Sequence, residues 1–234
     1  MKKKIAEIEI LRKVAFPILR KFNFEYGWKH DVTFRKLYLE TWFHKGYWFY
    51  GSKRESSELK MFNKLISNGD CVFEIGGHIG YITQIFEDLV GTEGKVLVAE
   101  PTPKSVYFLR KNVRDGTEVL PFAMAEVNGE MELFTEKFGG FTNSLVSEVT
   151  KASSERMFNL QEGGDNSTSK INVEVKTVDS ICDQYSVSPN FLKVDVEGAE
   201  LSVLKGAKQV LKNVKALMIE VSRNHKELFE FLKE

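Results

Sequence analysis

The sequence has only two cysteines in 234 residues, too few for a disulfide framework. Cys71 and Cys182 border apolar runs and are predicted to be buried thiols, which is consistent with a reducing, cytoplasmic setting. No apolar run approaches the roughly 18 residues that a bilayer requires, so a membrane-spanning helix is excluded. Glu7 and Glu9 interrupt the segment after the N-terminal lysines, without a small-residue cleavage site, and we expect no secretory signal.

The sequence also has no excess of charge of either sign. Lys and Arg together number 33, as do Asp and Glu, so no global field attracts nucleic acid, and we expect no nucleic-acid partner. No Cys/His cluster has zinc-ligand spacing, and no metal site is predicted. No serine sits on a glycine elbow, and neither cysteine has a plausible catalytic partner, which argues against acyl-enzyme chemistry.

Apolar strands alternate with helices over most of the chain, as in an α/β protein with a mostly parallel, Rossmann-like sheet and helices on both faces. The predicted strands are 71–75, 95–100, 117–122, 191–196 and 216–221. The predicted helices are 57–66, 79–89, 103–114, 199–211 and 225–233. Two segments with period-two alternation, 130–134 and 171–175, are expected to form an antiparallel insertion, and the polar stretch 136–170 between them is expected to be a mobile substrate loop or a disordered surface excursion.

Residues 1–55 differ in character and are predicted to form a helical, aromatic cap on a main domain of residues 56–234, within a single globular unit. Residues 2–22 have the spacing of an amphipathic helix with a basic face, which favours packing on the body or on another subunit and leaves surface docking open. Residues 22–50 carry many aromatic side chains. We expect that these side chains either pack a small cap against the main domain or form a lid whose rings stack on a flat or sugar-like substrate.

The segment from Val72 to Tyr81 has the strongest functional signal. A buried strand ends in Glu74, a turn with Gly76, Gly77 and Gly80 follows, and a helical pattern begins at once. Such turns let the backbone approach a nucleotide-like ligand closely. A carboxylate at this position repels a pyrophosphate and suits a ligand with an ammonium and a sulfonium. S-adenosyl-L-methionine is such a ligand.

Three further strand ends carry acids: Glu100, Asp195 and Glu220. Glu100 lies twenty residues after Gly80, where a carboxylate can accept hydrogen bonds from both ribose hydroxyls of an adenosine. Asp195 and Glu197 lie two residues apart at the active edge of the sheet, which suits a general base, a metal ligand or an anchor for the cofactor's amino group.

These motifs resemble the FkbM-type methyltransferase family in order and approximate spacing over residues 56–221. The stretch from Phe191 to Glu200, Phe-Leu-Lys-Val-Asp-Val-Glu-Gly-Ala-Glu, is the most specific of them. The resemblance implies a class I S-adenosylmethionine-dependent fold and O-methyl transfer to a hydroxyl of a sugar or another small molecule. The family pattern has Asp and then Ala-Asn where this chain has Glu74, Gly77 and His78, and it continues beyond the position of Glu234 into a further antiparallel strand.

By position, the resemblance implies that Glu74, Gly76 and Gly80 line the methionine half of the cofactor, Glu100 the ribose, and that Asp195 and Glu197 face the transfer site. The full set of residues expected to bind the cofactor is Glu74, Gly76, Gly77, His78, Gly80, Tyr81, Glu100, Pro101 and Asp195. Candidates for the general base are Asp195, Glu197, His78 and His225, with Asp195 first.

Several alternatives stay open at this point. A nicotinamide-dependent oxidoreductase on the same sheet is the rival enzyme, and a catalytically silent binding module is the non-enzymatic alternative. Assistance by a divalent metal, the identity of the hydroxyl acceptor and the formation of a homo-oligomer are not decided by the sequence.

Overall fold

The computed structural model describes residues 20–51, 55–135, 143–152, 168–221 and 223–233. A five-stranded parallel sheet forms the centre of this part of the chain. Its strands are β3 (Cys71–Ile75), β4 (Lys95–Ala99), β5 (Glu118–Leu120), β9 (Phe191–Val194) and β10 (Ala216–Ile219). They lie in the order β10-β9-β3-β4-β5, so the chain builds outward from β3 in one direction and then returns to β3's other side.

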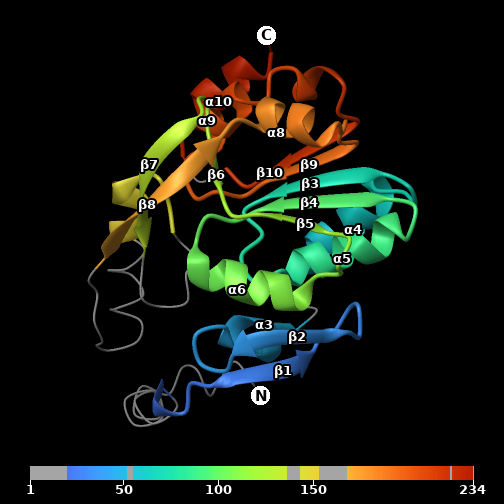
Figure 1. The fold of residues 1–234 in the computed structure, drawn as a ribbon, viewed down its shortest axis with the longest axis vertical. Helices are drawn as coiled ribbons and strands as arrows, with labels where there is room; N and C mark the ends of the chain where they lie inside the picture. The colour runs from blue at the N-terminus through green and yellow to red at the C-terminus, as the bar shows by residue number, and fades with distance from the viewer. Residues whose placement is uncertain (1–19, 52–54, 136–142, 153–167, 222, 234) are drawn as a thin grey trace.

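Helices cover both faces of this sheet, as the sequence predicts (Figure 1). One face carries α4 (Ser56–Leu65), α5 (Tyr81–Val90) and α6 (Pro103–Asn112), and the other carries α8 (Val178–Tyr185), α9 (Glu200–Lys205) and α10 (His225–Phe231). Successive side chains of a strand point to opposite faces. Val72 therefore packs with the α4–α5 core, while Phe73 and Ile75 pack with the core on the other face.

The predicted antiparallel pair is confirmed. β7 (Gly129–Thr135) pairs with β8 (Ser169–Lys176) over seven residue pairs, and the short β6 (Ala123–Met124) adds to β8 in parallel. Alternate residues Leu133, Val173 and Val175 form a small core of their own. The predicted substrate loop between these strands lies largely outside the described residues.

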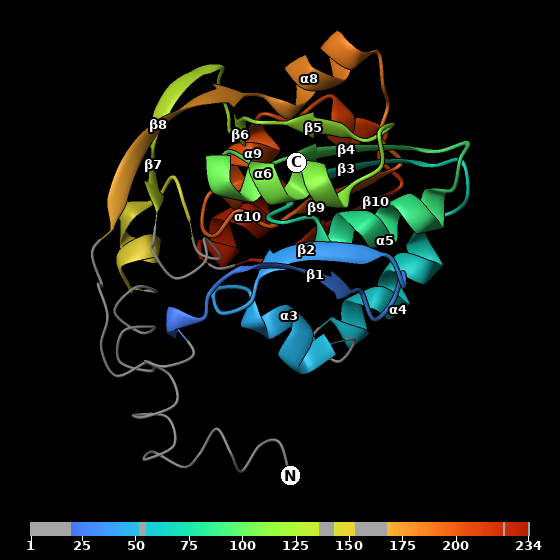
Figure 2. The same ribbon diagram turned by 60° about the horizontal axis from the view of Figure 1, so that its bottom comes forward.

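The described part of the cap contains a structure that the sequence analysis did not predict. β1 (Glu25–Lys29) and β2 (Lys36–Glu40) form an antiparallel hairpin, and the short α3 (Lys45–Tyr50) follows. Figures 1 and 2 show this hairpin against α5 and α6 rather than against the sheet. The predicted amphipathic helix of residues 2–22 lies outside the described residues except for its last turn, and the division at residue 55 stays a prediction.

Two helical segments also differ from the sequence analysis. The predicted helix 199–211 ends at Lys205, and the chain turns at Gly206 before a short 3₁₀ helix, Val210–Lys212. A Cβ on Gly206 would lie 2.1 Å from the carbonyl oxygen of Ala125, so no side chain fits at this turn. α8 was not predicted, although Thr177 caps it by accepting a hydrogen bond from the Ser180 amide at 3.0 Å.

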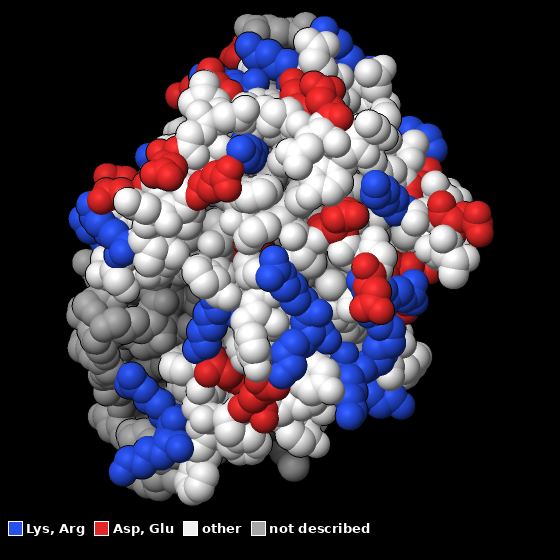
Figure 3. All heavy atoms as spheres, viewed as in Figure 1, with Lys and Arg blue, Asp and Glu red and all other residues white. Residues whose placement is uncertain are grey.

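None of the helices in the described ranges combines the length and apolar character needed to cross a bilayer. Lys, Arg, Asp and Glu side chains are interspersed over the face seen in Figure 3, in keeping with the balanced composition.

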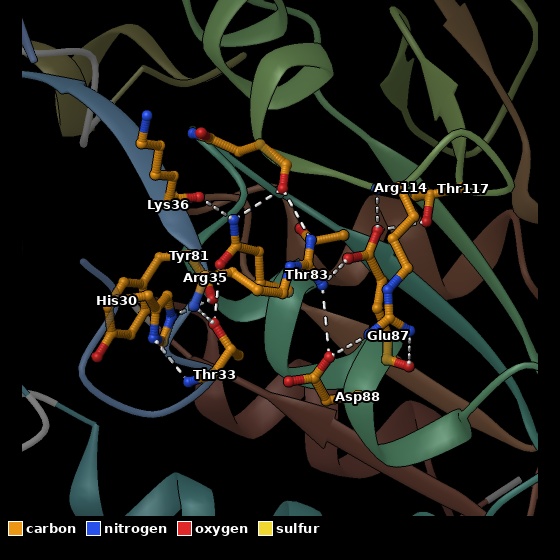
Figure 4. Close-up of polar contacts among 12 residues, drawn as sticks. His30, Thr33, Arg35, Lys36, Tyr81, Thr83, Glu87, Asp88, Arg114 and Thr117 are labelled. Atoms are coloured by element: carbon orange, nitrogen blue, oxygen red, sulfur yellow. Dashed lines mark hydrogen bonds and ion pairs between the residues drawn. The ribbon is translucent and has the colours of Figure 1, made fainter. Parts of the chain in front are cut away.

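Buried amides and an ion pair attach the hairpin to the main body, and Figure 4 shows the polar contacts around Arg35 and Glu87. Asn112, at the end of α6, is 3% exposed; its Oδ1 accepts a hydrogen bond from the Tyr38 amide at 2.6 Å, and its Nδ2 donates to the carbonyls of Tyr38 and Ile79. Gln84 of α5 donates to the carbonyls of Lys36 and Asn112. Arg35 completes the attachment with an ion pair to Glu87 at 2.6 Å. The hairpin is thus held by these polar groups and also by an apolar interface, because Leu37 and Leu39 of β2 are fully buried in the core that includes residues of α4 and α5.

We predict that Asn112→Ala destabilises the protein by about 3 kcal/mol, because it leaves the amide of Tyr38 and two buried carbonyls without partners. Asn63→Ala is the control: this exposed side chain only bonds the carbonyl of Leu59 on its own helix, and its loss should cost under about 0.5 kcal/mol. Chemical denaturation measures both. Equal losses would show that the hairpin is held in some other way.

Candidate functional site

The acids predicted at the strand ends come together around one cavity of about 600 Å³. It opens beyond the carboxyl ends of β3, β4, β9 and β10, where the order of the strands reverses between β3 and β9. Open α/β sheets bind their ligands at this point. Glu74, Glu100, Asp195 and Glu220 all line the cavity. Its volume falls in the range typical of small-molecule sites.

The glycine turn after β3 is shaped by its contact with β9. Gly76 has φ +94°, and a Cβ built on it would lie 1.9 Å from the carbonyl oxygen of Asp195. Gly80 also has a positive φ and begins α5. Only glycine meets both demands at Gly76, and the close approach places the turn directly beside the end of β9.

His78 occupies a position in the turn whose role the sequence analysis left undecided. Its φ of +47° lies in the left-handed region, where Asn, Asp and His are the most frequent residues apart from glycine. His is therefore compatible with the backbone that this turn requires. The Nδ1 of His78 lies 2.9 Å from the hydroxyl of Tyr47, which belongs to α3. His78 therefore connects the cap to the glycine turn.

Glu100 is buried and already oriented. Its Oε2 accepts a hydrogen bond from the His78 amide at 3.0 Å, and its Oε1 accepts one from the Thr102 amide at 2.8 Å. Burial raises the pKa of Glu100, although these backbone hydrogen bonds oppose the rise. A carboxylate fixed in this way is a preorganised acceptor for hydroxyl groups.

Glu74 is 1% exposed and accepts a hydrogen bond from the hydroxyl of Thr83 at 2.6 Å. Burial raises the pKa of Glu74 to about 7, and the nearby Lys193 works against that rise. A buried carboxyl with this pKa is partly protonated at neutral pH. A cation entering the cavity would favour its charged form.

Lys193 forms an ion pair with Asp195, its Nζ lying 2.8 Å from Oδ2. Burial acts to lower the pKa of Lys193, but the carboxylates of Asp195, Glu74 and Glu220 outweigh it, and the pKa is raised. Lys193 is therefore a permanent cation within the acidic cavity. The sequence analysis quoted this residue only as part of a motif and gave it no role.

Glu197 stands in a strained turn with φ +52°. Its carbonyl accepts a hydrogen bond from Ser144 at 2.6 Å, and the next amide, that of Gly198, donates to the buried Glu200 at 2.7 Å. Burial, followed by repulsion from Asp195 and Glu220, raises the pKa of Glu197 to about 7. Strained backbone at a cavity with a shifted carboxyl is typical of functional sites.

Most of the predicted site residues line this cavity: Glu74, Gly76, Gly77, His78, Tyr81, Glu100, Pro101, Asp195 and Glu197. Gly80 does not, because it shapes the start of α5 behind the turn. His225 is exposed at the start of α10 and is not among the residues that line the cavity, so its role as a base stays a prediction. Tyr47 and Ser144 line it without having been predicted, since they come from the cap and from the segment after β7.

The family model for the FkbM methyltransferase domain matches residues 74–234. The chain belongs to this family. The resemblance seen in the sequence is confirmed, and so are the class I methyltransferase fold and S-adenosyl-L-methionine as the cofactor. The match also decides between the two enzyme alternatives, in favour of methyl transfer over a nicotinamide-dependent oxidoreductase. No curated protein matches the chain.

Among solved structures, a protein from Clostridium thermocellum described as an rRNA-methylase is 10% identical over 76% of this chain and 78% of its own, with a TM-score of 0.43. Fibrillarin from Aeropyrum pernix, solved with natively bound S-adenosyl-L-methionine, is 13% identical over 90% of this chain and 71% of its own, with a TM-score of 0.38. Likenesses at this level carry no argument about the site, and the family match stands without them.

The cavity fits the cofactor chemically. The Gly76 turn provides a close-approach backbone, Glu74 provides a buried carboxylate for a cationic group, and Glu100 provides hydroxyl acceptors. Within the described residues, no three His, Cys, Asp or Glu side chains are grouped so that they could hold a metal ion.

We predict that Gly76→Ala destabilises the protein by about 3 kcal/mol or more, because the new methyl group meets backbone that cannot move aside. Gly69→Ala is the matched control. Gly69 also has a positive φ, +85°, but nothing lies within 4 Å of its Cβ position, so only the conformational cost of about 1 kcal/mol should appear. Thermal unfolding compares the two variants, and equal losses would show that the contact with Asp195 is unimportant.

The raised pKa of Glu74 predicts a pH dependence of stability. The folded protein holds the proton of Glu74 more tightly than the unfolded chain does. This proton therefore adds to the free energy of unfolding at pH values below the usual pKa of a glutamate, and the added stability is lost as pH rises through about 7. Between pH 6 and pH 8 the wild type should lose about 1 kcal/mol relative to Glu74→Gln. Denaturant unfolding at the two pH values measures the difference. If the stability difference between wild type and Glu74→Gln were the same at pH 6 and pH 8, Glu74 would titrate far from neutrality.

Proposed function

We propose that this protein transfers the methyl group of S-adenosyl-L-methionine to a hydroxyl of a small, sugar-like acceptor. Family membership supports methyl transfer, and the carboxyl of Glu197 supports a hydroxyl as acceptor. A hydroxyl must lose a proton as it attacks, so its enzyme needs a base. Glu197 combines a place in the cavity with a pKa near neutrality, which is the value that favours general-base catalysis at physiological pH.

The bound cofactor supplies an electrophilic methyl group on a sulfonium. The chain's own residues position it: Glu74 would pair with the ammonium group, and Glu100 would accept hydrogen bonds from the ribose hydroxyls, with Pro101 and Tyr81 on the wall nearby. Glu74 lies in β3, before the Gly76 turn, and Glu100 follows β4. Alignment of the reacting atoms is then the main contribution of the protein, as expected for an in-line displacement.

Glu197 would take the proton of the acceptor, with Asp195 beside it. Asp195 is already bound to Lys193, so its carboxylate is less available as a base. Its negative charge instead helps to raise the pKa of Glu197. We therefore place Glu197 ahead of Asp195 as the base, which reverses the order expected from the sequence.

The cap provides features that suit a sugar-like acceptor. Tyr47 of α3 lines the cavity, and the neighbouring Trp48 is exposed. The rings of Trp48, Trp28, Tyr26 and Phe24 follow one another with centroid separations of 6.2, 6.4 and 6.5 Å. This row of aromatic rings begins next to Tyr47 and offers apolar surfaces for the faces of sugar rings.

We predict that Glu197→Gln lowers kcat at least 100-fold while leaving the affinity for S-adenosylhomocysteine within about threefold, because a base acts on the acceptor and not on the cofactor. Transfer of labelled methyl groups from S-adenosyl-L-methionine to a panel of glycosides and to a small-molecule cell extract measures the rate. Calorimetry measures the binding.

Asp195→Asn and His225→Ala complete this experiment. Asp195→Asn should retain turnover and move the pH–rate profile to lower pH, since it removes a charge that raises the pKa of Glu197. His225→Ala should match the wild type. Loss of turnover in Asp195→Asn with normal rates in Glu197→Gln would make Asp195 the base. Tight S-adenosylhomocysteine binding without any methyl transfer by the wild type would instead support a silent binding module.

A further inference from the structure

The walls of the cavity are strongly acidic. Seven carboxylates line it: Glu55, Glu58, Glu74, Glu100, Asp195, Glu197 and Glu220. Lys193 is the single Lys or Arg among the described lining residues. S-adenosyl-L-methionine carries a carboxylate as well as two cationic centres, and a carboxylate placed at random in this cavity would be repelled. Among the described lining residues, Lys193 is the one Lys or Arg that attracts this carboxylate.

The glycine turn is the usual competitor for an anion, because successive backbone amides can bind a carboxylate. Here those amides are occupied. Gly76 and Gly77 both donate to the carbonyl of Ala99, at 2.9 and 3.2 Å, and Gly80 donates to the carbonyl of Gly77. The amide of His78 donates to Glu100. Four of the amides from residues 76 to 80 are thus engaged within the protein, which leaves Lys193 as the better anion receptor.

Lys193 also stands beside Glu74. The two residues are register partners on the neighbouring parallel strands β9 and β3, so their side chains leave the same face of the sheet. Lys193 is 8% exposed and Glu74 is 1% exposed, and both line the cavity. The ammonium has three donors, of which the bond to Asp195 uses one. A buried positive and a buried negative group side by side match the two charges of an α-amino acid.

We propose that Glu74 and Lys193 together bind the zwitterionic amino-acid end of the cofactor, with Lys193 binding its carboxylate. The proposal rests on S-adenosyl-L-methionine as the cofactor and assigns a role to Lys193, which the family resemblance did not. The pairing fixes the direction of the cofactor in the cavity: its amino-acid end lies over β3 and β9 and its ribose over β4, next to Glu100. It also makes the protein select ligands that carry the carboxylate.

Calorimetry with three probes tests this proposal. S-adenosylhomocysteine has both charges of the amino acid, its decarboxylated analogue has the amine alone, and 5′-methylthioadenosine has neither. Wild type should bind S-adenosylhomocysteine at least tenfold more tightly than the decarboxylated analogue. Lys193→Met should lower the affinity for S-adenosylhomocysteine at least tenfold and change that for 5′-methylthioadenosine less than threefold.

Lys95→Met is the matched control, because Lys95 begins the neighbouring strand β4 at the opposite end of the sheet and is not a cavity residue. It should leave all three affinities unchanged. An equal loss for every probe in Lys193→Met would show a structural role and overturn the proposal. So would a wild type that binds the decarboxylated analogue as tightly as S-adenosylhomocysteine, a comparison that holds even if the variant fails to fold. A wild type that binds none of the probes would refute the cofactor assignment itself.

Discussion

The contact between Gly76 and the carbonyl of Asp195 is the constraint on which the site depends. The turn after β3 and the end of β9 meet without room for a side chain, at the point where the order of the strands reverses. This contact brings a carboxylate from each of two distant segments of the chain to one cavity. It also sets the path of the turn, so that the His78 amide donates a hydrogen bond to Glu100, which follows β4.

Concentrating acids in this way has an electrostatic consequence. Seven carboxylates around one cavity repel one another, and burial adds to that repulsion. The structure accommodates this in two ways. Lys193 compensates part of the charge, and Glu74 and Glu197 have pKa values raised to about 7. The same arrangement serves the chemistry, because cationic groups of a ligand are attracted and a carboxyl poised near neutrality can accept a proton.

The cap shows how an added element can share in a site that the main domain builds. Its hairpin is held by Asn112, Gln84 and Arg35 against the outer side of α5 and α6. From there α3 brings Tyr47 to His78, in the middle of the glycine turn. A change of sequence in the cap therefore also reaches the glycine turn and the start of α5, because Tyr47 contacts both His78 and Tyr81.

The sequence by itself determined the central sheet, the antiparallel insertion and the acidic strand ends of the cavity, because buried strands and their glycine turns have strong local patterns. Glu74, Glu100 and Asp195 could be found from their positions at strand ends alone. The hairpin could not be found, because the aromatic residues of this segment are interpreted as cap packing or a lid and not as strands, and its attachment involves Asn112 and Gln84, far along the chain. His225 begins α10, and the sequence did not show that its side chain lies outside the cavity. Only the tertiary structure decided that Lys193 stands beside Glu74 and that Glu197 has a raised pKa, because both depend on how closely separate strands and their buried charges approach one another.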